Sequence, residues 1–215
     1  IGNNGLTIED LASFWQAIAK EFSTFKNIYG YGLMNEPHDL APETKWFDMA
    51  QASINAIREV DTNTLIMVGG NDWSSAERWI EQSDTLKFLK DPANNLAFEA
   101  HVYFDKDASG TYKYSYEEEE CYPEKGIDRV KPFVEWIKQN KFHGFIGEYG
   151  IPDNDPRWNE TLDLFLGYLQ ENGINGTYWA AGPWWDTYFM AITPKDGKDR
   201  PQMPIIEKYT STLKK

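Results

Sequence analysis

Hydrophobic and polar positions along the chain follow two periods in turn, which predicts alternating helices and strands. Apolar residues recur with the 3.6-residue period of amphipathic helices in segments near 8–22, 46–57, 75–82, 128–139, 162–169 and 202–213. Short, mostly apolar runs typical of buried strands occupy 29–34, 64–68, 96–104, 145–147 and 177–180. A polar segment over 105–122 predicts a long loop. This alternation is typical of the α/β class, with a parallel sheet buried on both faces.

The spacing of the predicted strands limits the architecture. They begin near residues 30, 64, 96, 144 and 177, a mean spacing of about 37 residues. Eight such units would need about 300 residues, near the roughly 250 residues of a (β/α)8 barrel. The 215-residue chain holds only five of them. The pattern therefore leaves two architectures open: an open doubly wound sheet, and the C-terminal part of a (β/α)8 barrel.

Composition excludes several classes of protein. The chain is 41% hydrophobic, which is ample for a packed core and excludes disorder. Its net charge of −13 argues against a nucleic acid or an anionic membrane as partner, and no run of 18 apolar residues predicts a membrane span. The single cysteine, Cys121, can form neither an internal disulfide nor a cysteine-based metal site. Nine tryptophans are unusual, and they favour a flat, ring-bearing ligand such as a carbohydrate.

Polar and aromatic residues follow every predicted strand, at the edge where the βα loops of a parallel sheet converge on an active site. In chain order these residues are Asn35-Glu36-Pro37-His38, Asn71-Asp72-Trp73, His101 with Tyr103 and Asp105, Glu148-Tyr149, and Trp179 with Trp184-Trp185-Asp186. None of these loops has the spacing of a glycine-rich phosphate loop, and no serine lies in a nucleophile elbow. Nucleotide chemistry and serine hydrolysis are therefore disfavoured. The four glutamates at 117–120 predict a solvated loop rather than a cation site.

Two carboxylates at strand ends, Glu36 and Glu148, are the strongest candidates for chemistry. Glycoside hydrolysis requires such a pair, in which one carboxyl protonates the leaving oxygen and the other stays ionised. By residue type alone, a salt-bridged surface glutamate is the commoner case. The positions favour catalysis, because Glu36 directly follows an apolar strand and Gly147 and Gly150 leave room beside Glu148 for a ligand.

Four motifs together closely resemble glycoside hydrolase family 5, the cellulase-type retaining enzymes. They are Tyr-Gly-Leu-Met-Asn-Glu-Pro-His at 31–38, His-Val-Tyr-Phe-Asp at 101–105, Ile-Gly-Glu-Tyr-Gly at 146–150 and Tyr-Trp-Ala-Ala-Gly at 178–182. Residues 105–111 resemble the branch of the family rich in bacterial and fungal endoglucanases. The resemblance spans essentially all 215 residues and favours the (β/α)8 barrel over the open sheet.

The resemblance also implies which part of the barrel the chain represents. In the family, Asn35-Glu36 would close the fourth strand, Glu148 the seventh and Trp179 the eighth. Residues 1–215 are therefore expected to form a partial catalytic domain with strands four to eight. An arginine and a histidine that the family keeps in its site have no counterpart here. An N-terminal fragment or a second chain is expected to complete the barrel.

The resemblance implies a role for each candidate catalytic residue. Glu36 would be the general acid/base and Glu148 the nucleophile, with carboxyl oxygens about 5 Å apart, as retaining enzymes require. Asn35 would hold the 2-hydroxyl of the sugar in the covalent-intermediate subsite. Tyr103 would donate a hydrogen bond to the nucleophile, and His101 would support Glu36 or contact a sugar hydroxyl.

The resemblance and the strand positions also predict which tryptophans bind substrate. Trp179 would be the stacking platform under the sugar at the cleavage point. Trp73, Trp184 and Trp185 follow strands and are expected to line outer subsites. Trp15, Trp46, Trp79 and Trp136 lie on predicted helices and are expected to pack in the core.

The expected function is that of a secreted endo-β-1,4-glucanase, which hydrolyses cellulose or a related β-glucan with retention through a covalent glycosyl-enzyme. No metal and no organic cofactor are implied. A β-mannanase or a xylanase of the same fold remains an alternative, because subsite loops set the choice of polysaccharide. An inactive carbohydrate-binding fragment that needs a second chain is another.

Overall fold

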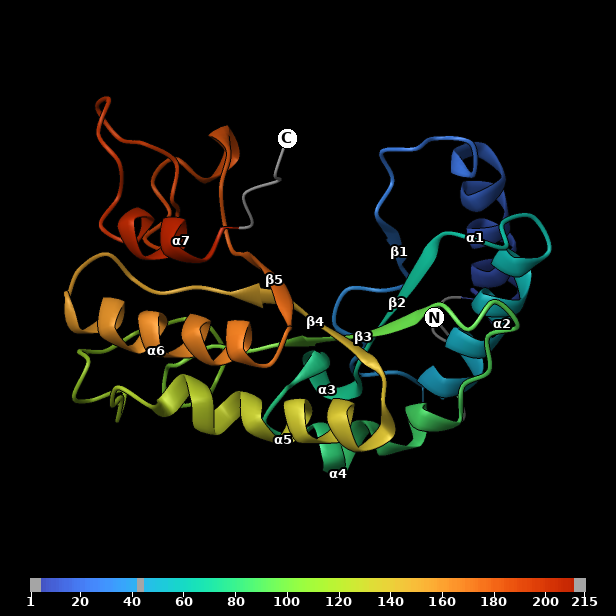
Figure 1. Ribbon diagram of the computed structural model, residues 1–215, viewed down its shortest axis with the longest axis horizontal. Helices are drawn as coiled ribbons and strands as arrows, with labels where there is room; N and C mark the ends of the chain where they lie inside the picture. The colour runs from blue at the N-terminus through green and yellow to red at the C-terminus, as the bar shows by residue number, and fades with distance from the viewer. Residues whose placement is uncertain (1–4, 42–44, 211–215) are drawn as a thin grey trace. The chain divides into compact units, whose positions relative to one another are not determined.

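The computed structural model of the protein describes residues 5–41 and 45–210. The chain divides into two compact units, one formed by residues up to 100 with 135–144 and the other by 101–134 with 145–215. The boundaries fall within strand β3 (Leu96–His101), helix α5 (Lys125–Asn140) and strand β4 (His143–Tyr149) (Figure 1). Each unit is a small α/β structure with parallel strand pairing, as the alternating pattern predicts.

The first unit holds three parallel strands in chain order. Strand β1 (Gly30–Gly32) pairs with β2 (Leu65–Gly69), and β2 pairs with β3, with Tyr31 opposite Ile66 and Met67 opposite Ala97. Helix α1 (Ile8–Phe22) packs beside helix α2 (Trp46–Arg58) (Figure 1). The Thr7 hydroxyl accepts a hydrogen bond from the Asp10 N–H at 3.1 Å, and the Asp10 carboxylate accepts one from the Thr7 N–H at 2.8 Å. This capping box fixes the start of α1.

Large aromatic side chains fill the interior of the first unit. Trp46, Trp79 and Trp136 are at most 2% exposed, which confirms their predicted packing role. The Trp46 indole donates a hydrogen bond to the Gly69 carbonyl at 2.7 Å and thereby ties α2 to the end of β2. Trp15 is only half-buried, and its indole N–H donates to the Leu33 carbonyl at 3.0 Å.

The segment after β2 differs from the single helix predicted at 75–82. The short segment α3 (Asn71–Ser74), which contains non-helical dihedrals, the helix α4 (Trp79–Ser83) and the 3-10 helix η1 (Asp84–Phe88) occupy this region instead, and residues 75–78 are not helical. Asp72, Trp73 and Ser74 have φ values of 54° to 56°. Three consecutive residues in the left-handed region cannot continue a right-handed helix, so the chain bends here.

The second unit holds the parallel pair β4 and β5 (Asn175–Tyr178), with Phe145 opposite Asn175. Helix α6 (Arg157–Glu171) packs against helix α7 (Met203–Tyr209), and a 3-10 turn, η2 (Pro183–Trp185), lies between β5 and α7 in the chain (Figure 1). Both helices have bounds other than those predicted. Helix α6 begins five residues before the predicted 162–169 and ends two after it. Helix α7 ends at Tyr209, and positions 211–213 of its predicted range lie outside the described residues.

The loop at 105–122 contains no helix or strand, as predicted, but it is held by buried carboxylates. The Asp105 carboxylate, 1% exposed, accepts hydrogen bonds from the backbone N–H groups of Gly110, Thr111 and Tyr112. Glu119 is also buried, and it accepts from the N–H groups of Lys106 and Tyr114. The prediction of a fully solvated glutamate run is therefore wrong at Glu119, because these loop amides need an acceptor away from water.

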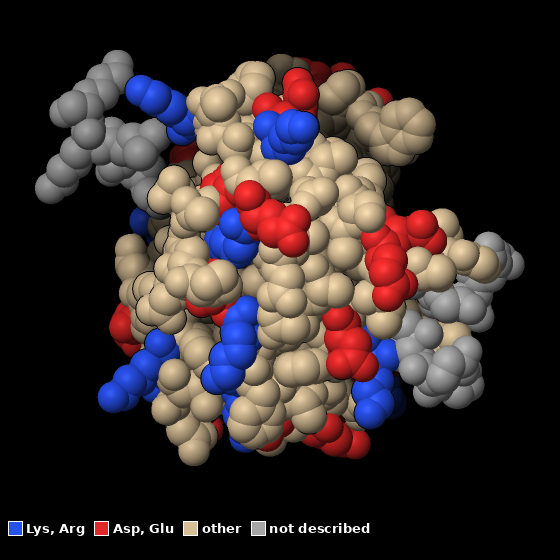
Figure 2. Space-filling view, turned by 90° about the vertical axis from the view of Figure 1, so that its right-hand side faces the viewer, with Lys and Arg blue, Asp and Glu red and all other residues tan. Residues whose placement is uncertain are grey.

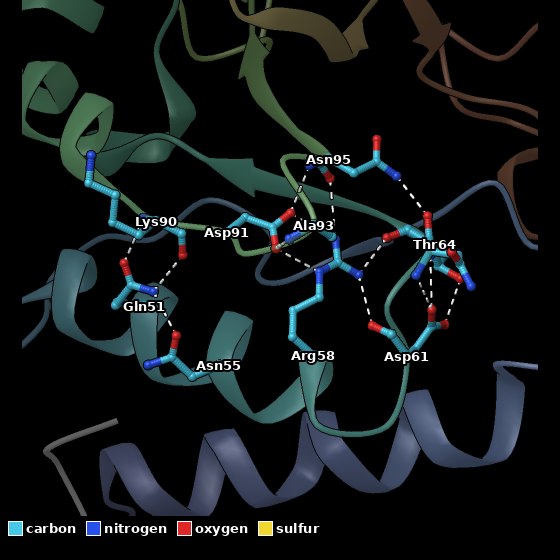
Figure 3. A network of polar contacts seen from close by, with 10 residues as sticks. Gln51, Asn55, Arg58, Asp61, Thr64, Lys90, Asp91, Ala93 and Asn95 are labelled. Atoms are coloured by element: carbon cyan, nitrogen blue, oxygen red, sulfur yellow. Dashed lines mark hydrogen bonds and ion pairs between the residues drawn. The ribbon is translucent and has the colours of Figure 1, made fainter.

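A buried ion pair joins the segments that precede β2 and β3 (Figure 3). Arg58, the last residue of α2, donates two hydrogen bonds to the Asp91 carboxylate at 2.7 and 3.0 Å. The same guanidinium donates to the carbonyls of Asp61 and Thr64. The side chains of the pair are 3% and 1% exposed. This network lies at the amino ends of the strands, where residues of parallel α/β folds support stability rather than chemistry.

Charge on the surface agrees with the composition. The face shown in Figure 2 carries acidic and basic side chains interspersed among neutral ones, without a continuous basic area. Among the helices of residues 5–41 and 45–210, none is both long enough and apolar enough to cross a membrane.

Candidate active site

Glu36 lies three residues after the backbone hydrogen bonding of β1 ends. The Leu33 N–H donates to the Met67 carbonyl at 3.1 Å, so the strand geometry continues to Leu33. Glu36 is half-buried with φ 45°, Asn35 before it is exposed, and Pro37 after it is buried. A positive φ is unfavourable for a glutamate and costs about 1–3 kcal/mol, and such residues cluster at functional sites.

His38 and Trp73 form a stacked pair beside a cavity of the first unit. Their ring centroids are 4.5 Å apart with an interplanar angle of 14°. Trp73 is 44% exposed, and the cavity of about 450 Å³ next to it is also lined by Asp39, Lys45 and Gln82. One face of the Trp73 indole is thus covered by the His38 imidazole, and the outer subsite at Trp73 stays a prediction.

Glu148, near the end of β4, has a defined set of partners in the second unit. The Tyr103 hydroxyl donates a hydrogen bond to Glu148 Oε2 at 2.7 Å, and His101 Nδ1 lies 3.7 Å from the same oxygen. His101 and Tyr103 are 5% and 7% exposed. Burial, and then the negative charge of Glu148, raise the pKa of Tyr103 far above its usual range. The phenol therefore stays protonated and can donate to the Glu148 carboxylate.

Aromatic side chains follow β5 in the same unit. Trp179 is half-buried, and its backbone N–H donates to the Tyr149 carbonyl at 2.9 Å. The centroid of its ring lies 4.9 Å from that of Trp185. Tyr188 packs against Trp185 at 5.1 Å. Trp184 is 89% exposed on η2 and presents nearly its whole indole to solvent. Trp179 and Trp184 therefore both offer ring surface to a ligand.

The candidate residues divide between the two units. His101, Tyr103 and Glu148 come together in the second unit, which also holds Trp179 and Trp184, whereas Asn35, Glu36 and Trp73 belong to the first. The expected separation of about 5 Å between the carboxyl oxygens of Glu36 and Glu148 stays a prediction.

Two residues of the region received no role from the sequence. The sequence assigns no role to His38, although its position directly after Glu36-Pro37 indicates that it belongs to the same loop. Tyr112 lies outside every motif, and yet its hydroxyl is hydrogen-bonded to the backbone next to Tyr103, at Phe104, and to the backbone close to Glu148, at Gly150. Its only sequence signal is that it follows the 105–111 stretch.

Comparison with known proteins identifies the family. Residues 1–184 match the family described as cellulase (glycosyl hydrolase family 5). The chain belongs to this family. Glycosyl hydrolase family 5 is the family that the motifs at 31–38, 101–105 and 146–150 predict, and its (β/α)8-barrel fold is confirmed for this chain, which supplies five strands within its described residues.

Named relatives and solved structures agree on the type of protein. Endo-beta-1,4-glucanase B of Emericella nidulans is 36% identical over 193 residues, which cover 87% of this chain and 56% of that protein. The probable endo-beta-1,4-glucanase B of Aspergillus kawachii is 34% identical over 93% of the chain and 59% of its own length. The chain thus spans little more than half the length of these curated relatives.

Two crystal structures illustrate the structural similarity. Pseudomonas stutzeri endoglucanase Cel5A is 41% identical with a TM-score of 0.90, and the match covers 99% of this chain and 64% of that one. Cel5A (EG2) from Hypocrea jecorina is 27% identical with a TM-score of 0.81, over 94% of this chain and 63% of that one. The fold is retained even where most side chains differ.

Proposed function

We propose that the protein is a retaining endo-β-1,4-glucanase that hydrolyses cellulose or a related β-glucan. The observation that carries the proposal is the hydrogen bond from Tyr103 to Glu148 at 2.7 Å, with His101 beside the same carboxylate oxygen. A carboxylate that a protonated phenol holds ionised at a strand end is suited to nucleophilic attack. Membership of the cellulase family and the endoglucanase names of the relatives support the choice of substrate.

In the first step, Glu148 attacks the anomeric carbon of the sugar at the cleavage point. The C1–O bond to the departing sugar breaks with its electron pair, and Glu36 in its acid form gives a proton to that oxygen. The products of this step are a shortened chain and a sugar bound covalently to Glu148. Asn35 holds the 2-hydroxyl, a contact that strengthens as the ring approaches an oxocarbenium ion.

In the second step, water releases the sugar. Glu36, now a carboxylate, takes a proton from water as the water oxygen bonds to C1, and the bond to Glu148 breaks with its electrons returned to the carboxylate. Two inversions at C1 give net retention. Trp179 supports the sugar by stacking on the face of the ring that carries axial C–H groups, and Trp73 and Trp184 extend the binding surface to neighbouring sugars.

The nucleophile can be identified directly. A 2-deoxy-2-fluoro-β-cellobioside with a good leaving group should accumulate as a covalent adduct, because fluorine destabilises both transition states and the leaving group accelerates only the first. Mass spectrometry of peptides should place the adduct on Glu148. The variant Glu148→Gln should form no adduct and show no turnover, and an adduct on any other residue would refute the assignment.

The acid/base residue can be distinguished from the nucleophile by azide rescue. In Glu36→Ala, azide should attack the glycosyl-enzyme from the side that Glu36 occupied and release the β-glycosyl azide. In Glu148→Ala, azide would instead replace the nucleophile and give the α-glycosyl azide. The anomer therefore reports the role, and the reverse result would show that the two roles are exchanged.

The range of substrates separates the alternatives within the same chemistry. Carboxymethyl cellulose, mixed-linkage β-glucan, mannan and xylan should be compared by reducing-sugar release, with the highest kcat/KM expected for a β-1,4-glucan. A preference for mannan or xylan would make the protein a β-mannanase or a xylanase of this fold. Binding to cellulose without any sugar release would favour a binding function.

We also propose that the chain corresponds to strands four to eight of the barrel and that a segment carrying three further βα units completes it. The motif order and the 56–59% share of the relatives' length support this. In the second unit, Asn175, Gly176 and Thr177 of β5 are exposed beside a cavity of about 840 Å³ that Leu166, Leu169 and Ile206 help to line. A parallel strand with apolar side chains suits this position.

Complementation tests the partial-barrel proposal. Residues 1–215 should be assayed on carboxymethyl cellulose alone and after co-expression with the first three βα units of a family relative. Activity that appears only with the second polypeptide is expected. Full activity of residues 1–215 by themselves as a monomer would contradict it.

We also propose that the protein acts outside the cell, because polymeric β-glucan is too large to enter a cell. Activity should then be found in the culture medium of the native host. Activity confined to the cell lysate would refute it.

A further inference from the structure

The hydroxyl of Tyr112 connects two backbone segments of the second unit that each carry a residue of the proposed site. It donates a hydrogen bond to the Gly150 carbonyl at 2.6 Å and accepts one from the Phe104 N–H at 2.9 Å. Phe104 directly follows Tyr103, and Gly150 comes two residues after Glu148. The Tyr112 hydroxyl therefore joins the backbone segment of Tyr103, the hydrogen-bond donor, to the backbone segment of Glu148, the acceptor.

The backbone around Glu148 is fixed by hydrogen bonds at four consecutive carbonyls. The carbonyl of Glu148 accepts from the Val102 N–H, and that of Tyr149 accepts from the Trp179 N–H. The Gly150 carbonyl accepts from Tyr112, and the Ile151 carbonyl accepts from the side chains of Tyr178 and Gln202. Two of these bonds also reach the segment of Tyr103: the backbone bond from Val102, and the bond from Tyr112, which makes the connection through a side chain.

Close packing leaves Gly150 little freedom to compensate for a lost bond. A Cβ at this position would overlap the Trp179 carbonyl oxygen and come within 3.2 Å of Met190 Sδ. Tyr112 itself is 7% exposed, and its ring packs edge-on against Trp158 at 5.0 Å. Its N–H donates to the buried Asp105 carboxylate, so both ends of the residue are held.

We propose that Tyr112 is a positioning residue for the reaction at Glu148, and that its hydroxyl sets the distance between the Tyr103 phenol and the Glu148 carboxylate. The inference rests on the proposed function of Glu148 as the nucleophile. A hydrogen bond to a charged acceptor weakens steeply with distance and misalignment, so a small shift between the two segments weakens the bond that keeps Glu148 ionised. Burial raises the pKa of Tyr112 well above its usual range, so its hydroxyl keeps the proton that it donates to the Gly150 carbonyl.

The variant Tyr112→Phe removes the bridging oxygen and keeps the ring. Tyr116→Phe is a matched control, because Tyr116 is equally buried, belongs to the same loop and packs edge-on against the same Trp158 at 4.7 Å. Its hydroxyl contacts Thr161 Oγ1 rather than the backbone near Glu148. Tyr112→Phe loses two buried hydrogen bonds and Tyr116→Phe loses one, so we expect Tm to decrease in both variants and somewhat more in Tyr112→Phe.

Kinetics on a soluble β-glucan should separate the two variants. Tyr112→Phe should lower kcat by about tenfold or more with KM changed less than about twofold, since misplacement of reacting groups slows chemistry rather than binding. Its activity should also begin to fall at higher pH on the acidic side, because a carboxylate with a weaker donor is protonated more readily. Tyr116→Phe should keep both quantities within about twofold of the wild type. Equal kcat values and pH profiles for the two variants would overturn the proposal.

A measurement without activity keeps this test apart from the proposed function. The Phe104 amide loses its acceptor in Tyr112→Phe but not in Tyr116→Phe, so its hydrogen–deuterium exchange should accelerate only in the first variant. Unchanged exchange would refute the bridge itself. Faster exchange with unchanged kcat would refute the positioning role. If the wild type forms no fluorosugar adduct at Glu148, the proposed function fails, whatever the exchange data show.

Discussion

At the scale of single residues, the Tyr103–Glu148 pair makes the most direct prediction. Tyr103→Phe removes the donor at 2.7 Å from Glu148 Oε2. A hydrogen bond to a charged group contributes about 1.5–3 kcal/mol, so kcat should fall by about 10- to 100-fold. The fluorosugar trapping rate should decrease in parallel, because the first step depends on the same carboxylate.

A neighbouring tyrosine provides the control for that prediction. Tyr149 is also buried, but its side chain points to the opposite face of β4 and packs against Phe165 at 5.3 Å. Tyr149→Phe should keep kcat within about twofold of the wild type. A comparable loss in both variants would show that any buried hydroxyl near β4 matters equally, and would contradict the special role of Tyr103.

The sequence was informative for residues whose side chains carry the chemistry. Strand periodicity placed Glu148 and Tyr103 at the carboxyl edge of the sheet, and the family resemblance paired them, as the 2.7 Å contact confirms. Tyr112 could not be found in this way. Its partners are a backbone N–H and a backbone carbonyl, 8 and 38 residues away, and backbone groups leave no trace in residue identity.

At the scale of elements, the turn after β2 shows where periodicity fails. Apolar spacing at 75–82 predicted one helix, but residues 75–78 are not helical and follow three left-handed residues at 72–74. The apolar pattern predicts that Trp79 is buried, but it does not predict that the backbone at Gly70 lies against the Trp79 ring. Gly69 and Gly70, whose spacing does not fit a phosphate loop, make this passage possible.

The close approach at Gly70 gives a prediction of stability. A Cβ on Gly70 would lie 2.5 Å from the Trp79 ring and 2.9 Å from Ser83 Oγ. Because Trp79 is fully buried and cannot move aside, Gly70→Ala should destabilise the protein by about 1–3 kcal/mol. Gly32→Ala is the control, since its Cβ would meet only Glu99 Oε2 at 3.8 Å. Denaturant unfolding checks both, and equal midpoints would contradict the packing argument.

At the scale of the whole molecule, the two ends of the strands serve different purposes. The carboxyl ends carry the candidate catalytic residues, and one of them, Glu36, has an unfavourable positive φ. The amino ends of β2 and β3 carry the Arg58 network (Figure 3). This network could not be predicted from the sequence. Arg58 and Asp91 are 33 residues apart, and either could equally have been a solvated surface charge.

The response of stability to acid should depend on the carboxylate of Asp61 in that network. It accepts hydrogen bonds from the N–H groups of Asn63 and Thr64, from the Thr64 hydroxyl at 2.6 Å and from the Tyr31 hydroxyl at 2.9 Å. Burial alone would raise the pKa of Asp61, but these bonds, led by that of the Thr64 hydroxyl, lower it to about 2. The folded state therefore binds this proton less readily than the unfolded chain.

A depressed pKa contributes stability that is present above the unfolded value near 4 and is lost as the pH falls through about 2. The shift corresponds to about 2 kcal/mol. The free energy of unfolding, measured by urea titration between pH 5 and pH 2, should thus decrease more steeply in the wild type than in Asp61→Asn, which has no proton to gain at this position. The variant should be less stable at pH 5, because the asparagine amide cannot accept all four hydrogen bonds, and the two curves should converge towards pH 2. Parallel curves over this range would show that Asp61 keeps an ordinary affinity for protons in the folded protein, and that acid acts on other carboxylates.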